Sequence, residues 1–188
     1  MMFSQKIFNN NTCYISGLHR SGKSLLTAII PSIEKTGLIN KDPTLNLVPA
    51  MYVNQEINLE SAKYLVRYIQ SNINYSNFIG RKINQKKNDE TSIYNHMNYQ
   101  KYLKKIKSKF MIEDPVRSKD KETSFYDIHN MLVNLKFWRQ TDNNFKLINI
   151  DRNPIDLAYS WYKNKFGSIS ESPINQLLIY KLNKTLVP

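Results

Sequence analysis

The stretch Gly17-Leu18-His19-Arg20-Ser21-Gly22-Lys23-Ser24 decides the fold of this chain. It follows a short apolar run at residues 13–16 and leads into apolar residues 25–30, so we expect a strand, a tight turn and a helix in that order. The spacing matches G-x-x-x-x-G-K-[ST], in which glycines allow the turn and successive backbone N–H groups bind one anion. Arg20 and Lys23 add positive charge for phosphoryl or sulfuryl oxygens. The stretch predicts an anion-binding loop.

Composition places the chain among globular proteins with anionic partners. Its 188 residues suit one domain, and 41% of them are hydrophobic against 22% charged. The formal charge of +12 favours phosphorylated cofactors, acidic substrates, nucleic acid or anionic lipid without choosing among them. The single cysteine, Cys13, excludes an intrachain disulfide. No signal peptide or membrane anchor precedes residue 12, so we expect a soluble protein of the cytoplasm.

Apolar runs alternate with helical patterns along the chain. This alternation predicts an α/β fold, with three α/β/α layers and a mainly parallel sheet. Residues 74–90 are rich in Asn and Lys and are expected to be the least structured. We expect strands at 12–16, 45–53, 110–112 and 145–150, and helices at 23–35 with a C-cap near Gly37, at 59–73, 91–107 and 124–140, from Asn153 to near Gly167, and at 173–186.

A second candidate anion site lies at residues 151–160. Arg152 leaves a strand end where a helix begins, and Ser160 follows about two turns along that helix. Both side chains could therefore face one phosphate beside the sheet, where Gly17 and Asp114 are also expected. The alternative is structural, with Arg152 paired to Asp156 and Ser160 an ordinary helix residue.

Together the two stretches resemble the sulfotransferase family that uses 3′-phosphoadenosine 5′-phosphosulfate. Residues 18–26 are similar to the loop that holds the 5′-phosphosulfate, and Arg152 with Ser160 is similar to the family's 3′-phosphate motif. Residues 113–117 resemble its Lys-Asp-Pro-Arg segment. The resemblance runs from about residue 12 to residue 167. It implies one P-loop-like, nucleotide-binding domain over residues 1–188, trimmed at its C-terminal end because little chain follows Ser160.

The resemblance also implies an activity and its residues. The chain would move a sulfuryl group to a hydroxyl or amine, releasing adenosine 3′,5′-bisphosphate, without a required metal ion. Arg20 would stabilise the leaving phosphate, and the general base would be a His or a Glu, with Glu56 ranked ahead of His19 and Asp114. His96 and His129 are expected on a surface or a helix face. The expected cofactor-binding residues are Gly17, Arg20, Ser21, Gly22, Lys23, Ser24, Arg152 and Ser160.

Two departures from the family keep an alternative open. Lys23 stands where the family usually has Thr or Ser, and Glu113 stands where it often has Lys. The complete G-x-x-x-x-G-K-S match also suits a Mg²⁺-dependent kinase or NTPase, with Asp114 or Asp151 at the metal. A third interpretation, a nucleic-acid or membrane-surface binder, has only the basic excess in its favour. The acceptor and the oligomeric state are not indicated by the sequence.

Overall fold

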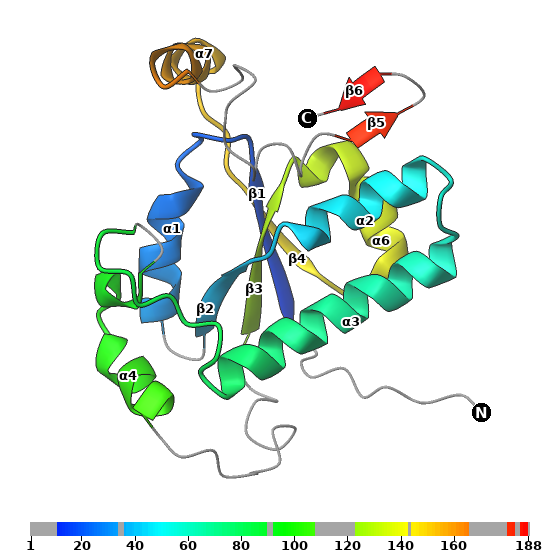
Figure 1. Ribbon diagram of the computed structural model, residues 1–188. Helices are drawn as coiled ribbons and strands as arrows, with labels where there is room; N and C mark the ends of the chain where they lie inside the picture. Colours follow the sequence, from blue (N-terminus) through cyan, green and yellow to red (C-terminus); the bar gives the residue numbers. More distant parts are fainter. Residues whose placement is uncertain are drawn as a thin grey trace, which may run out of the picture.

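In the part of the chain that the structure describes, four parallel strands form the central sheet in the order β2-β3-β1-β4 (Figure 1). They are β1 (Thr12–Gly17), β2 (Thr36–Lys41), β3 (Thr123–His129) and β4 (Lys146–Asn149). The computed structural model describes residues 11–33, 36–89, 92–107, 123–142, 144–165, 180–182 and 185–187. All six residues of β1 are buried, as expected of a strand with neighbours on both sides. Gly17 is in register with His129 of β3, so both lie at the carboxyl edge of the sheet.

Helices cover both faces of this sheet. On one face α2 (Thr44–Val53), α3 (Leu59–Phe78) and α6 (Leu135–Thr141) pack on Tyr14 of β1 and on Tyr126 and Ile128 of β3 (Figure 1). On the other face the α1 side (Lys23–Ile29) packs on Cys13 and Ile15. Alternate residues of β1 therefore enter opposite cores, as the two-residue period of a strand requires. The predicted three-layer α/β/α architecture is confirmed.

The second strand lies elsewhere than predicted. Residues 45–53, expected as a strand, form helix α2, in which Leu45, Val48 and Pro49 are buried at helical spacing. The strand is β2 instead, and the expected helix cap Gly37 lies inside it. The first helix is accordingly shorter than predicted, because α1 ends at Ile29 and a 3-10 turn at Ile30–Ser32 follows.

The predicted helix at 124–140 is also wrong. Its first part is strand β3, followed by a 3-10 turn at Met131–Asn134 and then by α6. Phe125 and Ile128 fit helical spacing, but they belong to a strand buried on both faces, where apolar residues run almost without a break. Asn130 has a positive φ of 53° and ends the strand.

The remaining expectations are met in part. The helix predicted at 59–73 is confirmed and extends through residue 78, and β4 confirms the strand predicted at 145–150. Asn153 caps α7 (Pro154–Lys163). Its side-chain oxygen accepts hydrogen bonds from the backbone N–H groups of Ile155 and Asp156. The expected helix at 91–107 is a 3-10 turn at Ile93–Asn95 followed by α4 (Tyr99–Lys107).

Two C-terminal strands replace the end of the last predicted helix. Residues 180–182 and 185–187 form an antiparallel pair, β5 (Tyr180–Leu182) and β6 (Thr185–Val187). The strand predicted at 110–112, the segment at 113–117 and the helix end near Gly167 lie outside the described residues. Within the described part of the chain, no helix has both the length and the apolar character to cross a bilayer.

Candidate functional site

Two glycines fix the shape of the loop between β1 and α1. Gly17 has a φ of 143° and Gly22 a φ of 105°, both in the region that favours glycine. A Cβ atom at Gly17 would lie 2.5 Å from the carbonyl oxygen of Ile150, so a side chain does not fit there. At Gly22 no atom lies within 4 Å of the position a Cβ would take. The loop is therefore in close contact with Ile150, just after β4, at Gly17, and has open space beside it at Gly22.

Ser21 and Arg20 indicate that the open space beside Gly22 is suited to an anion. The hydroxyl of Ser21 is buried, and the described residues offer it no hydrogen-bond partner. An unpaired buried hydroxyl is costly, and a bound anion would satisfy it. Arg20 has a positive φ of 66°, which is strained for a residue with a side chain. Both features fit a loop shaped to hold an anionic group.

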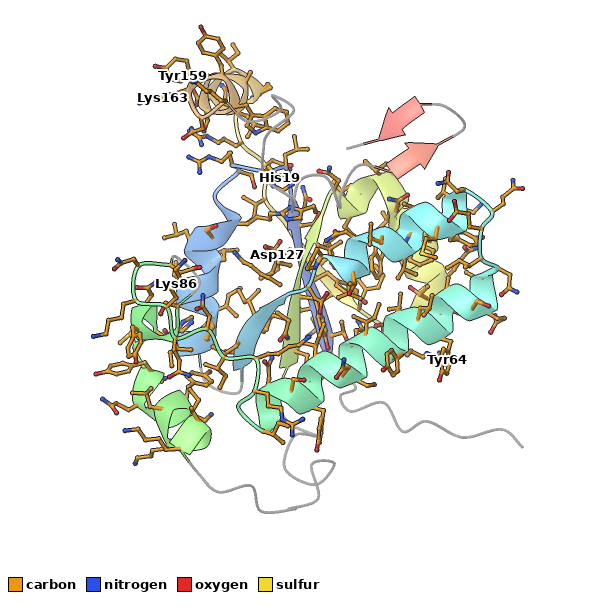
Figure 2. All side chains as sticks on the ribbon, viewed as in Figure 1. His19, Tyr64, Lys86, Asp127, Tyr159 and Lys163 are labelled. Atoms are coloured by element: carbon orange, nitrogen blue, oxygen red, sulfur yellow. The ribbon has the colours of Figure 1, made fainter. Side chains whose placement is uncertain are left out.

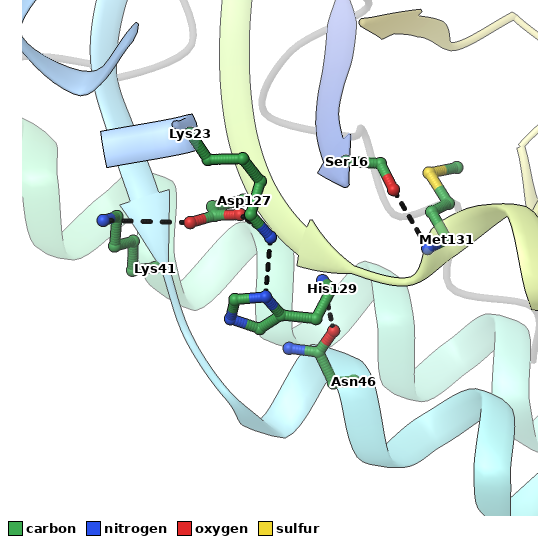
Figure 3. Close-up of polar contacts among 7 residues, drawn as sticks. All are labelled: Ser16, Lys23, Lys41, Asn46, Asp127, His129 and Met131. Atoms are coloured by element: carbon green, nitrogen blue, oxygen red, sulfur yellow. Dashed lines mark hydrogen bonds and ion pairs between the residues drawn. The ribbon is translucent and has the colours of Figure 1, made fainter. Parts of the chain in front are cut away.

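Lys23 points into the protein at the edge of the sheet (Figure 3). Its ammonium lies 3.1 Å from Asp127 Oδ1, and both side chains are only 6% exposed. It also donates a hydrogen bond of 2.6 Å to Nδ1 of His129. Asp127 is shared with Lys41, whose Nζ lies 3.8 Å from Oδ2, and Asn46 accepts from the backbone N–H of His129. The loop lysine thus belongs to a buried charge cluster made by β2, β3 and α1.

The histidines of this cluster are held neutral. Burial, with the positive charge of Lys23 and then of His19, lowers the pKa of His129 to about 4. Burial and Lys23 lower the pKa of His19 as well, and its ring stacks on that of His129 with centroids 3.9 Å apart. Burial also lowers the pKa of Lys23, although Asp127 opposes that shift. Since Lys23 donates to Nδ1, geometry assigns the proton of His129 to Nε2.

The second motif meets the loop directly. Arg152, just before α7, donates through a guanidinium nitrogen to the carbonyl oxygen of Arg20 at 3.0 Å. Arg20 Nε donates to the hydroxyl of Ser160 at 3.4 Å, and Trp161 Nε1 donates to the carbonyl oxygen of His19 at 2.8 Å. Segments about 140 residues apart in the chain are thereby joined at one edge of the sheet.

A comparison with protein-family models identifies the domain. The model of the sulfotransferase domain matches residues 11–181, which is most of the chain. The chain belongs to the sulfotransferase family. No curated protein and no solved structure matched it. Membership makes the protein a transferase that uses a nucleotide cofactor and an acceptor substrate.

The residues predicted for the sulfotransferase site fall into two groups. The loop residues from Gly17 to Ser24 lie together with Arg152 and Ser160, joined by the hydrogen bonds above. Glu56 lies in the turn between α2 and α3 with an exposed side chain, and Figure 1 places that turn on the far side of the molecule from α1. Asp114 lies outside the described residues.

Sequence reasoning missed two residues that contact Lys23 of the loop. Asp127 and His129 were hidden by the helix predicted for 124–140, and the expected place of His129 on a surface or helix face is corrected to the end of β3. Figure 2 shows Asp127 between β3 and α1, below His19. The signal that could have found them is their spacing of two, which puts both on one face of a strand. His96, also expected at a surface, is buried.

Proposed function

We propose that the chain transfers the sulfuryl group of 3′-phosphoadenosine 5′-phosphosulfate to a hydroxyl or amine acceptor. The observation that carries the proposal is the junction of the two anion motifs. Arg152 and Ser160 contact Arg20 of the loop, so a nucleotide with its two phosphate groups at different positions could contact both motifs at once. A nucleoside triphosphate has no second phosphate position that would use Arg152 and Ser160.

Two independent features of the loop suit the sulfuryl donor. The buried hydroxyl of Ser21 has a donor proton to offer, and the space over Gly22 leaves room for oxygens close to the backbone. Ser21, Gly22, Lys23 and Ser24 would hold the 5′-phosphosulfate. Arg152 and Ser160 would hold the 3′-phosphate.

In the reaction the acceptor oxygen or nitrogen forms a bond to sulfur and loses its proton to a base, while the bond from sulfur to the bridging phosphate oxygen breaks. Charge grows on that phosphate oxygen, so a cation beside it lowers the barrier most. Arg20 is the proposed cation, because it belongs to the loop and its side chain is exposed on the side of α7. Lys23 adds charge if the bound anion draws it from Asp127.

Two residues compete for the role of general base. Glu56 was ranked first from sequence, but its turn lies far from α1. His129 lies beside the loop, in contact with Lys23, so it is the base we favour. While burial and the charge of Lys23 hold its pKa at about 4, it is neutral at pH 7 but a weak base. Its Nδ1 accepts a hydrogen bond from Lys23. It becomes free to take a proton only when Lys23 turns toward the anion.

The test is nucleotide binding without metal. Adenosine 3′,5′-bisphosphate should bind in EDTA about tenfold or more tightly than AMP, the scale of hydrogen bonds to a charged group. Arg152→Gln and Ser160→Ala should each remove most of that difference. Lys163→Gln removes an exposed cation at the end of α7 (Figure 2); it is the matched control and should leave the difference unchanged. Equal affinity for the two nucleotides in calorimetry, or tight binding of ATP that depends on Mg²⁺, would contradict the proposal.

A further inference from the structure

A cavity of about 470 Å³ lies along the outer edge of β2. Its walls are β2 with the residues that follow it, the last turns of α3, residues 81–84, and the segment that carries Ile93 and His96. β2 is an edge strand, so the cavity opens beside the sheet and not within its core. Its volume is in the range of sites for small organic molecules.

The cavity adjoins the anion loop through one side chain. Lys41 lines it at the carboxyl end of β2 and lies 3.8 Å from Asp127, which in turn lies 3.1 Å from Lys23. In parallel α/β sheets, ligands bind at the carboxyl ends of the strands. A molecule in the cavity would therefore lie next to the place where the donor is proposed to bind.

The lining has a net positive charge. The cavity is lined by three cations, Lys41, Arg81 and Lys82, and by one acid, Asp42. Asp42 is already satisfied, because it accepts hydrogen bonds from the backbone N–H and hydroxyl of Thr44 and from Lys82 at 3.4 Å. Although burial opposes ionisation, these contacts lower the pKa of Asp42, so it is a carboxylate at neutral pH. Among the described residues no acid lies within ion-pair distance of Arg81.

Apart from His96, the rest of the lining is apolar or carries amides. Asn40 and Asn77 are hydrogen-bonded to each other, and Asn40 is held further by the carbonyl oxygen of Phe125 at 2.9 Å. These contacts fix the polar wall in place. The apolar wall consists of Leu38, Ile39, Ile73, Ile83 and Ile93. The lining thus combines cations with a hydrocarbon surface.

We propose that this cavity is the acceptor site, and that it selects acceptors carrying a carboxylate, sulfate or phosphate group beside a hydrocarbon part. The inference rests on the proposed function, since it takes the donor to lie at the loop. Arg81 and Lys82 bind the anionic group by charge-assisted hydrogen bonds. The apolar wall packs on the hydrocarbon part. The acceptor's hydroxyl then lies at the Lys41 end of the cavity, next to the donor.

The experiment compares two probes that differ in one charge, para-hydroxyphenylacetate and para-hydroxyphenylacetamide. Their dissociation constants are measured with saturating adenosine 3′,5′-bisphosphate, and kcat/KM for sulfuryl transfer is measured in parallel. The wild type should favour the acid about tenfold or more in both measurements, as expected for hydrogen bonds between charged groups.

In the double variant Arg81→Gln/Lys82→Gln, the ratio by which the protein favours the acid over the amide should fall close to one. The control, Lys86→Gln/Lys87→Gln, removes the same charge from two exposed lysines of the same segment that do not line the cavity, and should keep the preference for the acid. Figure 2 shows the position of Lys86. Unchanged circular dichroism and unchanged affinity for the bisphosphate show that the first variant is folded.

The outcomes separate this inference from the proposed function. Equal binding of acid and amide, preference for the amide, or no binding of either probe at millimolar concentration overturns the acceptor site, even if sulfuryl transfer occurs. An acid preference that survives in Arg81→Gln/Lys82→Gln overturns it too. Binding that favours the acid, without any sulfuryl transfer, supports the anion-selective cavity and counts against the proposed donor.

Discussion

The buried pair of Lys23 and Asp127 predicts a strong, asymmetric coupling between two substitutions. At 3.1 Å and an effective dielectric constant of about 20, Coulomb's law gives an attraction of about 5 kcal/mol before desolvation is subtracted. Asp127→Asn leaves Lys23 buried beside a second cation, Lys41, and should lower the free energy of unfolding by about 3–5 kcal/mol. Lys23→Met should cost less, about 2 kcal/mol, because Asp127 keeps Lys41 as a partner.

The double variant removes both charges and should be no less stable than Asp127→Asn alone. The expected coupling energy is about 2–3 kcal/mol. It is measured by urea unfolding of the wild type, both single variants and the double variant, followed by far-ultraviolet circular dichroism.

A double-mutant cycle on Glu60 and Lys63, measured in the same way, provides the control. These residues form an ion pair of 2.8 Å on the surface of α3, where Glu60 is 81% exposed. Their coupling should stay below about 0.5 kcal/mol, since solvent screens an exposed pair. If Lys23 and Asp127 prove additive within that same margin, the assignment of a buried ion pair is refuted. If Lys23→Met proves the more harmful change, the role given to Lys41 is wrong.

Three further predictions concern the loop and His129. Gly17→Ala should destabilise the protein more than Gly22→Ala, because both have a positive φ but only the first places a Cβ against the carbonyl of Ile150; thermal unfolding of the two variants checks this. Arg20→Ala should lower kcat about a hundredfold while changing the dissociation constant for adenosine 3′,5′-bisphosphate much less, and the reverse pattern would move the leaving-group role to another cation. The pKa of His129 is lowered from 6.5 to about 4, so the unfolded chain takes up its proton first, and the free energy of unfolding should fall as pH drops between those values. His129→Gln should make this fall smaller in urea titrations, and an identical pH dependence would contradict it.

The parts of the site that could be predicted from sequence are those fixed by local chemistry. The loop from Gly17 to Ser24 follows from glycine spacing, and the start of α7 follows from Asn153 and Pro154, which act within one helical turn. These signals do not depend on what packs around them. Both were therefore placed correctly, and the resemblance to the family rested on the loop and on Arg152 and Ser160, which flank that helix start.

The parts that could not be predicted depend on contacts between distant segments. Strand β3 is buried on both faces, so its apolar residues do not alternate, and their spacing was equally compatible with a helix. The apolar residues of 45–53 predict a short strand that Pro49 would interrupt or keep peripheral, yet the segment forms helix α2 with Pro49 inside it. The pairing of Lys23 with Asp127 joins residues about 100 positions apart, and no local pattern encodes it.

The hydrogen bond from Trp161 to the carbonyl of His19 gives the protein an optical reporter of its own. Indole emission responds to the polarity and hydrogen bonding of the ring, and this ring is half-buried where α7 meets the loop. The other tryptophan, Trp138, is fully enclosed in the core between the sheet and α3 and supplies a constant background. A titration of ligand can therefore be followed in unlabelled protein, and Trp161→Phe tells which ring produced the change.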